Sequence, residues 1–173
     1  MLNGLYNFPF KGNRLVEGWE LATILTLQTG NPVTFYTTNR TLTGSGTVRA
    51  SVTGPVQTGF SPALNGNATY VAYVQNPAVF YDQGNAFGNL GRNTVIGPGF
   101  SNLDFAVIKN VKLRENLSWQ VRADAFDILN HANLGQPGGT VATATFGQIT
   151  NTRWPTGDSG SSRQLQLAMK LVF

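Results

Sequence analysis

The run at positions 163–173, RQLQLAMKLVF, constrains the fold of this chain more than any other stretch. Its apolar side chains occupy alternate positions, at Leu165, Leu167, Met169, Leu171 and Phe173. Most positions between them are polar, among them Gln164, Gln166 and Lys170. Because side chains alternate between the two faces of a strand, the run predicts a strand with one apolar and one polar face. Transmembrane β-strands of about 9–11 residues have this length and period, so we predict a transmembrane β-barrel.

The composition favours the same fold class. Charged residues make up 12% of the chain, whereas soluble proteins usually carry roughly 25%. No apolar run reaches the roughly 18 residues that a transmembrane helix needs. Low charge without long apolar runs is what strands with alternating polarity produce in a membrane barrel.

Four further stretches carry the period of a strand, at positions 2–8, 18–29, 102–113 and 117–129. Trp19 and Trp119 each lie close to a short turn, so we predict that they are interfacial aromatic residues of a membrane barrel. Near Lys109 the alternation becomes ambiguous, and we expect a β-bulge there.

The connections between these stretches alternate between short and long. Short turns are expected at 10–16 and 114–116, and long glycine-rich loops at 38–100 and 131–162. Outer-membrane barrels have short periplasmic turns and long extracellular loops. The predicted fold is therefore an all-β, antiparallel, up-and-down barrel segment of about five strands with two long extracellular loops. The first loop carries several aromatic residues, so we expect it to be packed in places and to hold a short strand at 68–74.

The polar positions of these strands are predicted to face the barrel lumen. The set comprises Glu20, Asp104, Gln120, Arg122, Asp124, Gln164, Gln166 and Lys170. They either contact a substrate or a plug, or they form a cross-strand ladder that stabilises the sheet by roughly 0.2–1 kcal/mol per pair. We favour the ladder.

Catalytic and metal chemistry have no support in the sequence. The chain has no cysteine, and His131 is its single histidine, so it contains neither a thiolate site nor a histidine cluster. No pairing of a nucleophile with a base is visible, and we expect neither a cofactor nor an enzymatic activity. The basic residues are scattered without a stripe, which argues against a nucleic-acid partner.

Several short motifs occur in an order and spacing that resemble those of a known family. They are GNLGRN at 88–93, GPGF at 97–100, NLDF at 102–105, RADAFDILNHANLG at 122–135, FGQIT at 146–150 and LAMKLVF at 167–173. Together they resemble TonB-dependent outer-membrane receptors of the Oar-like group, which carry a carboxypeptidase-regulatory-like domain. The resemblance covers most of the chain.

The resemblance implies energy-coupled uptake of a bulky nutrient, such as a siderophore or a glycan, across the outer membrane of a Gram-negative-type bacterium. Members of this family have a barrel of about 22 strands, an N-terminal plug and an energy-coupling box. We therefore expect residues 1–173 to be an incomplete C-terminal barrel segment, since MLNGLYNFPF lacks the features of a signal peptide. The implied partners are outer-membrane lipid, the rest of the same receptor chain, the TonB complex and the barrel-assembly machinery.

Phe173, with the alternating apolar residues before it, resembles the signal that the barrel-assembly machinery recognises. The unpaired backbone groups of an edge strand provide the physical basis for such recognition by strand addition. A second interpretation of the whole chain is a soluble all-β extracellular binding or adhesin module, carbohydrate-binding modules included. Low charge and many Gly, Thr and Asn residues would suit that class too.

Overall fold

The structure, a computed structural model, describes residues 1–38, 47–62, 69–84, 86–153 and 162–173. The chain forms two compact units. The first, here called the strand unit, comprises residues 1–28, 100–133 and 154–173. The second, the loop unit, comprises residues 29–99 and 134–153.

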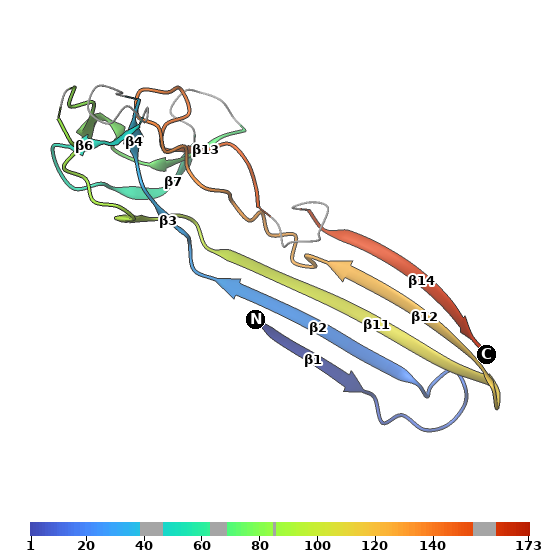
Figure 1. Cartoon of the computed structure of the whole chain (residues 1–173). Coiled ribbons are helices and arrows are strands. Elements are labelled where there is room, and N and C mark those ends of the chain that lie inside the picture. Colours follow the sequence, from blue (N-terminus) through green and yellow to red (C-terminus); the bar gives the residue numbers. More distant parts are fainter. Residues whose placement is uncertain (39–46, 63–68, 85, 154–161) are drawn as a thin grey trace. The chain divides into compact units, whose positions relative to one another are not determined.

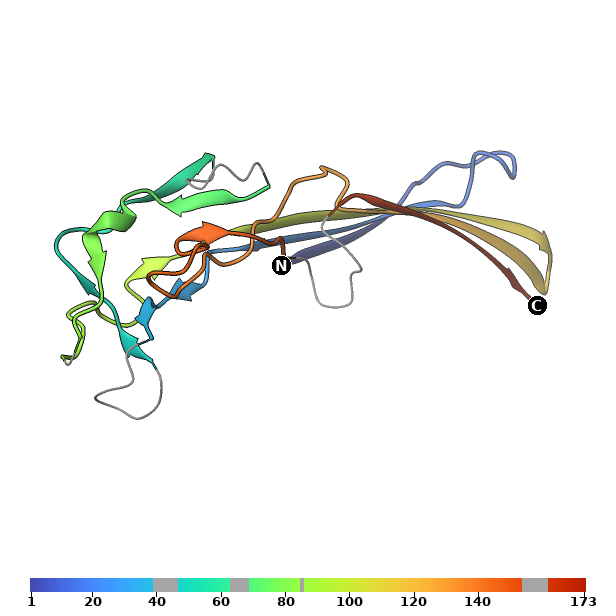
Figure 2. The same ribbon diagram turned by 90° about the horizontal axis from the view of Figure 1, so that it is seen from above.

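The strand unit contains one antiparallel sheet in which strands that follow one another in the unit are also neighbours (Figure 1). The order is β1 (Leu2–Asn7), β2 (Trp19–Gln28), β11 (Phe100–Arg114), β12 (Leu117–Phe126) and β14 (Gln164–Val172). All five predicted strands are therefore confirmed, and so is their up-and-down order. The long strands curve together (Figure 2), and the sheet is not closed into a barrel.

The register of the sheet separates apolar from polar side chains. Leu25 lies between Leu2 and Leu103, and Val121 is opposite Met169. The resulting face is apolar over all five strands. Its members include Leu2, Tyr6, Trp19, Leu21, Leu25, Leu27, Leu103, Phe105, Val107, Val111, Trp119, Val121, Leu165, Leu167, Met169 and Leu171. No described residue covers its β14 edge, where the Leu167 side chain is 82% exposed.

β11 has a register irregularity of the kind expected near Lys109, but it lies further along the strand. Pairing between β11 and β12 is continuous through Lys109, and the register shifts between Lys112 and Arg114 instead. The alternation is ambiguous in the sequence because Lys109 itself lies on the apolar face. Its ammonium group is buried there by the connection that precedes β2.

Both predicted short connections are confirmed, at residues 8–18 and 115–116. In the first, the Asn13 side chain accepts hydrogen bonds from the backbone N–H groups of Leu15 and Val16, both at 3.1 Å. The connection ends at Gly18, whose φ of 79° lies in the left-handed region. A Cβ atom at this position would lie 2.3 Å from the Asn110 carbonyl oxygen, so glycine is required on steric grounds as well.

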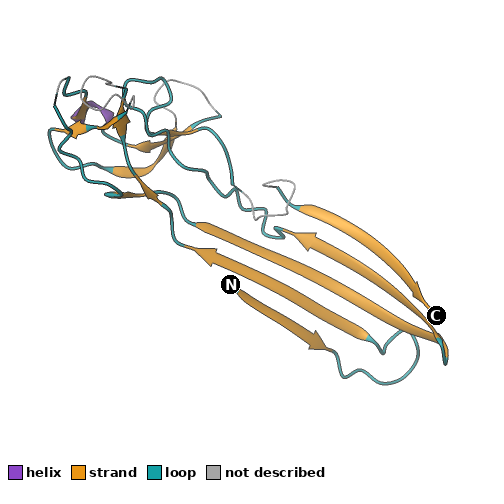
Figure 3. Ribbon diagram, viewed as in Figure 1, coloured by secondary structure: helices purple, strands orange, loops and turns teal. Residues whose placement is uncertain are grey.

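The loop unit contains short elements instead of a structureless loop (Figure 3). They are β3 (Pro32–Val33), β4 (Tyr36–Thr37), β5 (Val48–Arg49), β6 (Ser51–Val52), β7 (Thr58–Pro62), β8 (Val71–Val74), the 3-10 helix η1 (Pro77–Val79), β9 (Phe80–Tyr81), β10 (Val95–Ile96) and β13 (Gln148–Ile149). The pairs are β3 with β10, β4 with β5, and β6 with β9, while β8 lies between β7 and β13. β8 confirms a short strand within 68–74, although position 68 falls outside the described residues. In the described part of the chain, no helix is long and apolar enough to cross a membrane.

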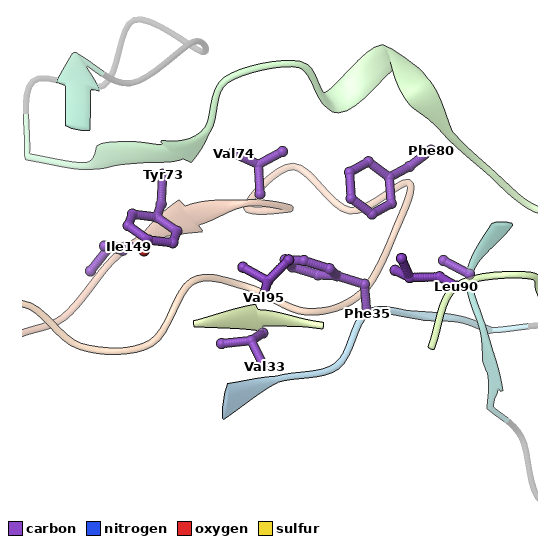
Figure 4. Close-up of a cluster of buried hydrophobic side chains, with 9 residues drawn as sticks. Val33, Phe35, Tyr73, Val74, Phe80, Leu90, Val95 and Ile149 are labelled. Atoms are coloured by element: carbon purple, nitrogen blue, oxygen red, sulfur yellow. The ribbon is translucent and has the colours of Figure 1, made fainter. Parts of the chain in front are cut away.

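A hydrophobic core holds the loop unit together (Figure 4). Phe35, which is fully buried, contacts the rings of Phe80 and Phe146 at centroid distances of 5.1 and 5.5 Å. The rings of Phe80 and Phe146 are 4.9 Å apart, and all three pairs adopt the edge-to-face geometry that aromatic rings favour. The expected packing of the long loop is confirmed, and the packed unit begins at residue 29 instead of 38.

Candidate functional site

The eight polar residues predicted to face the lumen share one face of the sheet. Gln120 lies between Asn110 and Lys170, and Asp124 is opposite Gln166. The register places Glu20, Asp104, Arg122 and Gln164 on this same face, opposite the apolar one. The eight residues thus share one face, as their alternate positions in the sequence predict, and their facing a lumen stays a prediction.

A chain of hydrogen bonds crosses three strands on the polar face. The Asn110 side chain donates to Glu20 Oε1 at 2.8 Å, and Gln120 donates to Asn110 Oδ1 at 2.8 Å. These bonds link β2, β11 and β12, and they form a cross-strand ladder of the favoured kind. Asn110 is the central member, and it was not among the residues predicted from the sequence. Asn110 is an even number of positions from Asp104 in the same strand, so the alternation of the sequence already places it on the polar face.

Arg122, Asp124 and Asp104, on the same face, do not take part in this chain of hydrogen bonds. Arg122 Nε lies 2.7 Å from Asp124 Oδ1, two residues along the same strand. Asp104 Oδ1 accepts hydrogen bonds from the Asn102 side chain at 2.8 Å and from the backbone N–H of Asp127 at 3.0 Å. The sheet therefore does not bring Arg122 and Asp104 together, although they occupy neighbouring strands.

Trp19 and Trp119 both lie on the apolar face, close to the short connections. Trp19 is opposite Lys109, and Trp119 is opposite Val111 two positions further along β11. The indole N–H of Trp19 donates to the Leu15 carbonyl oxygen at 3.0 Å. An apolar ring with a satisfied polar atom is the arrangement expected of an interfacial tryptophan.

Lys109 is a charged residue in the middle of an otherwise apolar stretch of β11 on the apolar face. Its ammonium group donates to the carbonyl oxygens of Leu15, at 3.0 Å, and Glu17. It also lies 5.0 Å from the centroid of the Trp19 ring, within range of a cation–π interaction. The connection between β1 and β2 thus supplies the partners of a charge that lies on the apolar face.

The segment that follows β12, within the motif at 122–135, forms hydrogen bonds with the start of β11. The buried side chain of Asn133 accepts from the Ser101 N–H at 2.8 Å and donates to the Ser101 carbonyl at 2.9 Å. His131 Nδ1 lies 3.3 Å from Ser101 Oγ. Among the described residues, no group of three or more His, Cys, Asp and Glu side chains is arranged to hold a metal ion.

The apolar residues of the last strand are exposed along its length. Leu165, Leu167, Met169 and Leu171 lie on the apolar face, and Phe173 follows the end of β14 with its side chain exposed. Their role as an assembly signal stays a prediction.

Comparison with known proteins identifies the class to which this sheet belongs. The family model of an outer membrane beta barrel domain matches residues 1–166. The chain belongs to the outer membrane beta barrel domain family. The predicted fold class is thereby confirmed, and this β-barrel domain is that of an outer-membrane protein. No curated protein and no solved structure matches the β-barrel domain.

Proposed function

We propose that this β-barrel domain forms the C-terminal strands of a TonB-dependent receptor that takes up a bulky nutrient, such as a siderophore or a glycan. The observation that carries the proposal is the five-stranded sheet with one continuous apolar face, joined to a folded unit made from the two long connections. Family membership supports the outer-membrane barrel. The receptor type rests on the order of the motifs between residues 88 and 173.

In this proposal the apolar face contacts lipid and the polar face lines the lumen. Transmembrane barrel strands alternate in this way, and aromatic residues gather where the apolar band meets water. Trp19 and Trp119 would then lie at the interface near the periplasmic turns. The polar face, with the hydrogen bonds that join Glu20, Asn110 and Gln120, forms the wall of the lumen.

The two edges of the sheet require further strands. β1 and β14 each pair on one side only. In lipid, unpaired N–H and C=O groups find no water, so an open edge is strongly disfavoured. We propose that the rest of the same receptor chain pairs with these edges, and that the barrel-assembly machinery recognises the alternating apolar residues of β14. In this proposal the plug of the receptor, and not this domain, would interact with TonB.

The test is to isolate the native protein from its Gram-negative source by an antibody against the loop unit. We expect it in the outer-membrane fraction, with the mass of a complete receptor, and we expect it to bind the purified periplasmic domain of TonB. A location in the outer membrane without binding to TonB would overturn the receptor type. Recovery as a soluble secreted protein would favour the adhesin or binding module instead.

A further inference from the structure

The motif GNLGRN at 88–93 attaches one loop firmly to the strands beside it. A Cβ atom on Gly88 would lie 2.0 Å from the Arg49 carbonyl oxygen, so only glycine allows this approach. The Asn89 side chain bonds both the N–H and the C=O of Val52, at 2.8 and 2.9 Å, as a neighbouring strand would. Leu90 is buried in the core of the loop unit. Three of the six residues thus have a structural role.

Asn93 fixes the other end of the motif. Its φ of 56° places it in the left-handed region, and its backbone N–H donates to Thr34 Oγ1 at 3.0 Å. The Thr34 hydroxyl in turn lies 3.0 Å from Asn93 Oδ1. Arg92, between these anchors, is exposed, and its guanidinium group makes no hydrogen bond with any described residue.

The ribbon of β4 and β5 presents a second arginine. Phe35, Thr37 and Val48 are buried on one side of this ribbon. Tyr36 is directly opposite Arg49 in the antiparallel register, so their side chains share the other side. The described residues offer the Arg49 guanidinium no carboxylate partner, since their one ion pair joins Arg122 and Asp124.

These side chains meet at a recess of about 650 Å³ within the loop unit. Its lining includes Thr34, Tyr36, Arg49, Phe87, Arg92 and Asn93. The volume lies within the usual range of small-molecule sites, roughly 300–1,000 Å³.

The charge around the recess is positive. No acidic side chain is among the residues that line it. The sequence of the whole loop unit contains four arginines and one acidic residue, Asp82, so its formal charge is 4 − 1 = +3. A cleft lined by one sign of charge concentrates ligands of the opposite sign.

We propose that this recess binds a short acidic oligosaccharide, that is, a chain of hydroxyl-rich sugar rings that carry carboxylates. Two guanidinium groups without acidic partners are suited to bidentate bonds with carboxylates. The hydroxyl of Thr34 and the amide of Asn93 supply neutral polar groups for sugar hydroxyls. Phe87, whose side chain is 68% exposed, and Tyr36 supply flat surfaces for the apolar faces of the rings. That this ligand is the transported substrate rests on the proposed function, whereas its binding to the recess does not.

The test uses the full-length protein, purified from the outer membrane in detergent, in a titration calorimeter. Trigalacturonate is the probe, maltotriose is the neutral control of equal ring number, and citrate is the carboxylate control without rings. We expect binding of trigalacturonate that weakens as the salt concentration rises, and no measurable binding of maltotriose. Arg49→Gln and Arg92→Gln should each weaken binding about tenfold, because each removes a charge-assisted hydrogen bond. Arg114→Gln, in the strand unit, is the matched control and should bind as the unchanged protein does.

Absence of trigalacturonate binding, equal binding of maltotriose, or wild-type affinity of both arginine variants would overturn the proposal. Citrate binding as tight as that of trigalacturonate would overturn the role of the sugar rings. The salt dependence of the unchanged protein gives a readout that does not depend on folding of the variants. Binding of trigalacturonate by a protein that fails to bind TonB would support the recess and overturn the receptor type, whereas the reverse result would overturn the recess alone.

Discussion

Lys109 is a charged residue at a position of β11 where the alternation of the sheet calls for an apolar one. A lysine on the lipid face of a barrel costs roughly 2–4 kcal/mol at the bilayer midplane but only about 0–1 kcal/mol near the interface. Lys109 is opposite Trp19, beside the short connection, and its ammonium group is bound by two carbonyl oxygens. Hydrogen bonds to a charged group stabilise by about 1.5–3 kcal/mol, so the contacts outweigh the cost of the position.

We therefore expect Lys109→Met to lower the free energy of unfolding by about 1–2 kcal/mol. The substitution removes the donor that the carbonyl groups of Leu15 and Glu17 share, and the methionine adds little stabilisation from apolar contacts. Urea unfolding in lipid vesicles, followed by tryptophan fluorescence, measures the difference. Lys112→Met, at an exposed position of the same strand, serves as control and should change stability by less than about 0.5 kcal/mol. Equal effects of the two substitutions would contradict this account of Lys109.

Strand β14 has an apolar face and a polar face, and the register assigns each of its residues to one of them. Leu167 is opposite Ala123 on the apolar face, and Ala168 is opposite Arg122 on the polar face. In the proposed barrel, neighbouring positions of β14 should therefore differ in the solvent that they meet, because the side-chain period of a strand is two.

Nitroxide labels on Leu167→Cys and Ala168→Cys test this alternation in lipid vesicles, and the chain has no cysteine of its own to interfere. We expect the label at 167 to collide more with oxygen, which dissolves in lipid, and the label at 168 to collide more with a water-soluble nickel complex. Ala123→Cys and Arg122→Cys, at matched depth on β12, should repeat the two results. Equal accessibility at 167 and 168 would refute the assignment of the faces.

For the whole molecule, the open edges and the uncovered apolar face decide how it behaves outside a membrane. β1 and β14 are both edge strands, and unpaired edges with exposed apolar side chains promote association between chains. We expect residues 1–173 alone to aggregate in buffer without detergent and to remain dispersed in micelles, where detergent covers the apolar face. Sedimentation velocity in both conditions measures this. A stable, compact monomer in buffer alone would contradict a lipid-facing role for the sheet.

The strand unit was predictable from the sequence almost throughout. In stretches such as 18–29 and 163–173, the alternation of apolar and polar residues shows on which face each residue lies. The predicted ends of the five strands are within three residues of the observed ones. The candidate recess was not predictable. Arg49 and Arg92 lie in the segment 38–100, which has no period and was predicted to be a long loop, and Tyr36 lies just before it.

The sequence by itself determined the five strands, their order and their two faces, because alternation of polarity is a local property that a single strand already shows. Only the tertiary structure decided what residues 29–99 and 134–153 form. There the core joins Phe35, Phe80 and Phe146, which are far apart along the chain. Which of the many apolar residues in such short segments meet depends on how the chain closes on itself, and no local period records that choice. The same holds for Lys109, whose place on the apolar face becomes understandable only when the carbonyls of residues 15 and 17 are seen around it.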